Sequence, residues 1–183
     1  MKYRVTVQPI FEPVTLEEAR AHLRADDDTA ENGTITGLIT AAREYCEAVT
    51  RQALAEQTIE AYPERLSGAI QLPVGPLLSV DSIVYTDSTN TERTVGETDY
   101  IADVLSCRIV PVQPWPTFDA APVTPIKITY IAGYDSAPLS VKQAMLLLIG
   151  HWYINREAVS PDIVRPVALA VDALLSIHKA GWF

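Results

Sequence analysis

The stretch Leu139–Ala158, LSVKQAMLLLIGHWYINREA, decides how the rest of the chain is interpreted. Apolar residues recur in it at the i, i+4, i+7, i+8, i+11 spacing of one helix face: Val141, Met145, Leu148, Ile149 and Trp152. Leu146, Leu147 and Tyr153 make the other sides apolar too, and such a helix is covered by more than one neighbour. The run is shorter than the roughly 18 residues that a bilayer span needs. It therefore predicts the central helix of a soluble assembly.

The composition of the chain limits its classes of partner. A length of 183 residues suits one domain, or one domain with an insertion. The formal charge of −9 argues against tight nucleic-acid binding, because that depends on Lys and Arg displacing counterions, and it disfavours anionic membranes. Cys46 and Cys107 form no CxxC pair, and MKYRVTVQPIF is not typical of a signal peptide. We expect reduced, buried thiols in a protein made in the cytosol.

The chain before the central helix predicts two further helices. Thr15 and Glu18 form a capping box, in which each side chain bonds the other residue's amide, at the start of a helix ending near residue 24. A second helix is predicted over 32–50, where one apolar stripe has helical spacing: Ile35, Leu38, Ile39, Ala42, Cys46 and Val49. We expect the charged residues off this stripe to lie in water: Arg43, Glu44 and Glu47.

Residues 55–134 have the pattern of short strands with Pro-rich connections. The clearest strand is predicted around Tyr130, where apolar residues alternate with polar ones, and Asp87-Ser88-Thr89-Asn90 has the composition of a turn. After the central helix, Pro166 fits the first turn of a last apolar helix. The chain therefore predicts an α+β fold. Residues 1–54 and 135–183 form a helical bundle, and residues 55–134 are an inserted antiparallel β lobe, within a single compact domain.

The acidic loop Asp26, Asp27 and Asp28 is the strongest candidate for a cation site. Aligned as an EF-hand loop, however, it places Ala30 and Ile39 where oxygen ligands are needed. A solvated acidic loop ahead of a helix is the better interpretation.

No other constellation of reactive side chains is present in the sequence. The three histidines lie on three different predicted helices, and there is no GxSxG motif, no HExxH motif and no glycine-rich phosphate loop. We predict no catalytic residue, no cofactor and no metal ligand.

Apolar surface in excess of what one small bundle can cover is the remaining signal. It favours contact between subunits, and the candidate interface residues are Met145, Leu146, Trp152, Leu169, Leu174 and Leu175. Trp115, between two prolines, is either a loop aromatic lying over the sheet core or an anchor for a partner. Trp182 and Phe183 at the end of the chain are further candidate partner contacts.

Three segments also carry a family resemblance. They are VTLEEARAHLRADDD followed by ITGLITAAREYCEAVTRQAL, then PIKITYIAGY followed by LSVKQAMLLLIGHWYINREAV, and a final VDALLSIHK. In this order and spacing they resemble the head–tail connector (adaptor) family of tailed bacteriophages, which includes the small connector of phage HK97. The resemblance is to its longer, β-inserted branch, found also in prophages and gene transfer agents. One departure is Ser140, where a proline is expected at the helix start.

The resemblance implies a virion structural protein of the neck, assembled in the cytoplasm of a bacterial host. Its copies form a ring, a dodecamer when docked, under the portal protein. The ring extends the DNA channel and presents a surface to the tail-completion (stopper) protein. DNA passes through without specific binding, and we hypothesise that Asp26, Asp27 and Asp28 face that channel. The alternative from another class is a monomeric module that binds a peptide or glycan with its β lobe.

Overall fold

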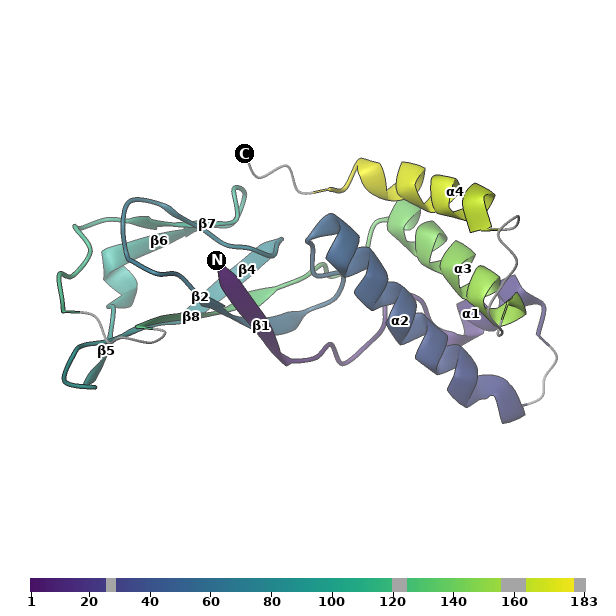
Figure 1. The fold of residues 1–183 in the computed structure, drawn as a ribbon, viewed down its shortest axis with the longest axis horizontal. Coiled ribbons are helices and arrows are strands. Elements are labelled where there is room, and N and C mark those ends of the chain that lie inside the picture. Colours follow the sequence, from purple (N-terminus) through teal and green to yellow (C-terminus); the bar gives the residue numbers. More distant parts are fainter. Residues whose placement is uncertain (26–28, 120–124, 156–163, 180–183) are drawn as a thin grey trace. The chain divides into compact units, whose positions relative to one another are not determined.

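The computed structural model describes residues 1–25, 29–119, 125–155 and 164–179. The chain divides into two compact units (Figure 1). A β-rich unit comprises residues 1–10 and 56–134, and a helical unit comprises residues 11–55 and 135–183. The α+β class is as predicted. The expected single domain is instead two units, and residues 1–10 belong to the β-rich unit rather than to the helical bundle.

The β-rich unit contains two antiparallel sheets. In spatial order the larger sheet consists of β1 (Lys2–Val7), β2 (Gln57–Tyr62), β8 (Ile126–Ala132), β4 (Leu77–Thr86) and β5 (Glu92–Thr94). The smaller sheet consists of β3 (Ile70–Gln71), β7 (Arg108–Pro111) and β6 (Tyr100–Asp103), and a short 3-10 helix, η2 (Glu97–Asp99), precedes β6.

Strand β8 is the centre of the larger sheet, with β2 on one side and β4 on the other. Its residues alternate between buried and partly exposed, as the period-two pattern predicts. Tyr130 is fully buried, and its hydroxyl donates a hydrogen bond to the carbonyl of Val74 at 3.2 Å. This bond satisfies a polar group that would be costly to bury unpaired.

Strand β1 corrects the predicted place of the N-terminal arm. The sequence pattern predicts that this arm, residues 1–10, belongs to the helical bundle, but it pairs antiparallel with β2, with Lys2 opposite Tyr62 and Val5 opposite Ile59. Of its six residues only Val5 is even half-buried. The arm is therefore an edge strand with both faces largely in solvent.

The helical unit contains α1 (Leu16–Leu23), the 3-10 helix η1 (Thr29–Glu31), α2 (Asn32–Thr50), α3 (Leu139–Ile154) and α4 (Val164–Ser176). The predicted capping box is present. The Glu18 amide donates to the Thr15 hydroxyl at 3.1 Å, and the Thr15 amide donates to the Glu18 carboxylate at 2.8 Å.

Helix α3 is the central helix of this unit, as predicted. It lies between α2 and α4 and also contacts α1 (Figure 1). Its buried residues are Val141, Ala144, Met145, Leu148 and Ile149.

Arg43 on α2 corrects the prediction that it lies in water. Its side chain is only 4% exposed and forms ion pairs with Glu12 at 2.9 Å and Glu47 at 2.8 Å. The second oxygen of the Glu47 carboxylate accepts a hydrogen bond from the Leu54 amide at 2.9 Å. The apolar stripe of α2 could not predict this cluster, because Glu12 belongs to the segment before α1. The cluster holds both that segment and the chain after α2 against the helix.

Candidate functional site

Two surface features of the described residues could serve a partner: the outer face of α4 and a pocket in the β-rich unit. Among the described residues no three potential metal ligands come together. In the same part of the chain no helix has the length and apolar character to cross a membrane.

The outer face of α4 is apolar and open to solvent. Leu169 is 70% exposed, and Ile177, one residue past the helix, is 74% exposed. These residues and the exposed Ala170 and Ala173 share one side of the helix, which we call the α4 stripe. On the opposite side of α4, Val171 is buried. The α4 stripe is thus apolar surface that the helical unit leaves uncovered.

The predicted interface residues differ in how much surface they offer. Met145 and Leu175 have no exposed surface, because both are enclosed within the helical unit. A fully enclosed side chain cannot contact a neighbouring subunit, so Met145 and Leu175 are core residues rather than interface residues. Four candidates keep exposed surface and remain a proposal: Leu146, Trp152, Leu169 and Leu174.

Ile177 is an exposed member of the α4 stripe that was not among the predicted interface residues. The sequence predicts an apolar helix after Pro166, but its pattern does not indicate which side of that helix stays open. The side chain of Trp152, by contrast, is partly buried by a contact within the helical unit. Its ring meets the ring of Tyr45 edge-on, with centroids 6.3 Å apart.

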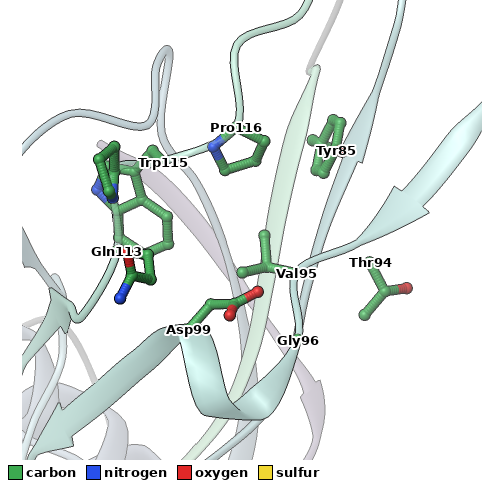
Figure 2. A pocket seen from close by; sticks show the side chains of 9 residues that line it. Tyr85, Thr94, Val95, Gly96, Asp99, Gln113, Trp115 and Pro116 are labelled. Carbon is green, nitrogen blue, oxygen red and sulfur yellow. The ribbon is translucent and has the colours of Figure 1, made fainter.

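The pocket lies in the β-rich unit and has a volume of about 220 Å³. It is lined by Tyr85, Thr94, Val95, Gly96, Asp99, Gln113, Pro114, Trp115 and Pro116. Figure 2 shows the rings of Trp115 and Pro116 on one side of it and Asp99 and Gly96 on the other. The Trp115 indole N–H donates to the carbonyl of Gly68 at 2.8 Å, which fixes the half-buried ring in place. Whether Trp115 also anchors a partner stays a prediction.

Neither cysteine thiol is in a reactive environment. Both cysteines are buried and unpaired. Burial raises the pKa of the Cys46 thiol to about 12 and the pKa of the Cys107 thiol to about 11. Because the thiolate is the reactive form, both side chains are inert near neutral pH.

The remaining predicted contact residues lie outside the described part of the chain. These are Asp26, Asp27 and Asp28, proposed for the channel, and Trp182 and Phe183, proposed for a partner.

The family of the chain is decided by a match over residues 13–106, just over half of its length, to the model of the phage gp6-like head–tail connector proteins. The chain belongs to this family. The match runs from the segment before α1 into the β6–β7 connection. This connector is accordingly a structural protein of a phage-like particle, as the resemblance implied.

Solved structures with the same fold come from gene transfer agent particles. The neck of an empty particle, computed with C6 symmetry, matches with a TM-score of 0.80 at 20% identity over 98% of this chain and 95% of that chain. The virion of a native particle matches with a TM-score of 0.74 at 19% identity over 95% of each chain. The neck of a native particle, computed with C12 symmetry, matches with a TM-score of 0.73 at 20% identity over 98% of this chain and 95% of that chain. No curated protein matches the chain.

Proposed function

We propose that this connector forms a closed ring in the neck of a phage-like particle, under the portal protein. The ring extends the DNA channel and docks the tail-completion protein. The α4 stripe is the observation that carries the proposal, because an exposed apolar helix face is surface that a neighbouring copy can bury. Two comparisons support the proposal: the chain belongs to the connector family, and its fold is similar to that of chains from necks computed with C6 and C12 symmetry. A dodecamer fits the C12 symmetry.

The charge of the chain suits a channel protein. At −9 the subunit repels the phosphate backbone, so DNA passes without being held. This role requires no catalytic residue. Asp26, Asp27 and Asp28 remain the proposed channel-facing groups, and replacing all three with Lys should slow DNA ejection from assembled particles.

A substitution on the α4 stripe tests the ring directly. Leu169→Glu places a charge in the contact, and Ala168→Glu places the same charge at an exposed position of α4 outside the stripe. We expect Leu169→Glu to abolish rings on portal-bearing heads in electron micrographs, and Ala168→Glu to retain them. Equal ring yield from the two variants would contradict the proposed use of α4.

Deletion of the gene tests the role itself. Full heads without tails are expected, and normal virions would refute the connector function.

A monomeric module that binds a peptide or glycan remains the alternative, because the pocket beside Trp115 offers an aromatic wall to a ligand. That alternative predicts a monomer that never joins a ring, even when portal-bearing heads are present.

A further inference from the structure

The hairpin formed by β6 and β7 ends in an exposed apolar tip. Leu105 is 97% exposed, the most of the large hydrophobic residues described, and the adjacent Val104 is 49% exposed. We call these two residues the knob. Its backbone is held firmly, because the Asp103 carboxylate accepts from the Ser106 amide at 3.1 Å and from Arg108 Nε at 2.8 Å. The knob is therefore a fixed projection rather than a loose loop.

The pocket lies at the other end of the same hairpin. Asp99 directly precedes β6 and Gln113 follows β7, and both line the pocket. The strands pair from Tyr100 with Pro111 near the pocket to Asp103 with Arg108 near the knob. Three residue steps of about 3.3 Å separate these pairs, so the knob lies about 10 Å or more from the pocket. One chain cannot fill its own pocket with its own knob.

The pocket is large enough for the knob, and part of its wall is apolar. About 220 Å³ accommodates a branched aliphatic side chain, and Val95, Trp115 and Pro116 offer it apolar contacts. The Trp115 N–H is already bonded to Gly68, so an apolar occupant leaves no indole donor unpaired.

The charges around the knob also permit this contact. Asp103 and Arg108 neutralise each other beneath the knob, in a chain whose net charge is −9. Asp99 is the charged residue among those that line the pocket. A neutral tip approaches that carboxylate without the like-charge repulsion that an acidic tip would meet.

We propose that the knob of each copy inserts into the pocket of the next copy around the ring, so that the occupant of the pocket is a second copy of this chain. This inference rests on the proposed ring. A closed ring is built from heterologous contacts, in which two different surfaces of each subunit meet. Opposite ends of one rigid hairpin supply such a pair of surfaces.

Disulfide trapping between copies tests the proposal. Subunits carrying Leu105→Cys and subunits carrying Gln113→Cys are mixed on portal-bearing heads that lack the native protein, and are then oxidised. We expect covalent dimers in the mixture, no dimer from either variant alone, and a ladder of multimers from the double variant. We expect no disulfide from Cys46 or Cys107, because both thiols are buried. The matched control pairs Leu105→Cys with Glu64→Cys, an exposed position outside the pocket.

The outcomes separate this proposal from the proposed function. Rings in electron micrographs without trapped dimers overturn the knob contact and leave the connector function standing. Trapping of Leu105→Cys to the portal or tail-completion protein also overturns it. Absence of rings from the unmodified protein overturns both.

A second variant tests the same contact without cysteine chemistry. Leu105→Asp should raise the subunit concentration needed for half-maximal ring formation by at least about tenfold, because a buried leucine contributes that factor or more. Unchanged ring formation by this variant would count against insertion. Because the knob is exposed in the single chain, the unfolding midpoint should stay the same.

Discussion

Helices α3 and α4 have similarly apolar sequences, yet they differ in what surrounds them. Helix α3 lies between α2 and α4 and contacts α1 as well, so Met145 on it has no exposed surface. Helix α4 packs mainly on α3 and leaves Leu169 70% exposed. The β-rich unit repeats this difference. Strand β8 is paired on both sides, while β1 is an edge strand with most of its side chains in solvent.

This contrast between central and outer elements shows that apolar composition alone does not determine burial. The position of an element among its neighbours decides whether its apolar residues stabilise the subunit or remain available to another chain. Central residues should therefore govern unfolding, and outer residues should govern assembly.

The largest expected effect is at Met145. Met145→Ala removes buried methylene groups and leaves a cavity, so we expect the free energy of unfolding to fall by about 3 kcal/mol. Leu169→Ala on the exposed stripe should change it by less than about 0.5 kcal/mol. Urea denaturation followed by circular dichroism measures both. Similar losses from the two variants would remove the distinction between the two helices.

The same comparison applies to ion pairs, one cluster of which is buried while another pair is exposed. Arg43→Met leaves Glu12 and Glu47 without their buried partner, and we expect a loss of about 3 kcal/mol. Arg4 on the edge strand β1 pairs with Glu60 on β2, and its side chain is 65% exposed. Arg4→Met should leave the urea midpoint nearly unchanged, because exposed ion pairs contribute little. A small effect of Arg43→Met would show that the buried cluster is dispensable.

Local sequence signals predicted much of the fold. The capping box at Thr15 and the apolar stripes of α2 and α3 depend on residues within a few turns of each other, and each corresponds to a helix in the structure. The alternation in β8 likewise predicted a strand. Such signals are read from a few consecutive residues, so no knowledge of distant contacts is needed.

What the sequence could not predict depends on partners far apart in the chain. Strand β1 pairs with β2 more than 50 residues later, so local patterns alone place residues 1–10 in the wrong unit. Arg43 is buried by Glu12 from before α1, a contact that no helical spacing indicates. The knob at Leu105 and the pocket at Trp115 emerge only once the β6–β7 hairpin is in place. Local patterns thus predict elements, and the assembly surfaces depend on how those elements pair.

The smallest expected effect concerns the edge strand and its pH dependence. The Tyr62 hydroxyl donates to the Glu60 carboxylate, and this bond and the Arg4 guanidinium lower the pKa of Glu60 below its ordinary value of 4.5. A group whose pKa is lower in the folded state stabilises the fold above its ordinary pKa. That stabilisation is lost as the pH falls from 4.5 through the lowered folded value.

Tyr62→Phe should therefore raise the pKa of Glu60 toward 4.5 and weaken the acid dependence of stability in that window. Carboxyl carbon shifts of Glu60, followed by NMR between neutral and acid pH, measure the change. Tyr3→Phe on the exposed edge strand is the control and should leave the Glu60 titration where it was. An unchanged Glu60 titration in Tyr62→Phe would mean that the hydroxyl contributes nothing at this edge. The Arg4 guanidinium, which reaches Glu60 from β1, would then be the side chain that lowers the pKa of this carboxylate.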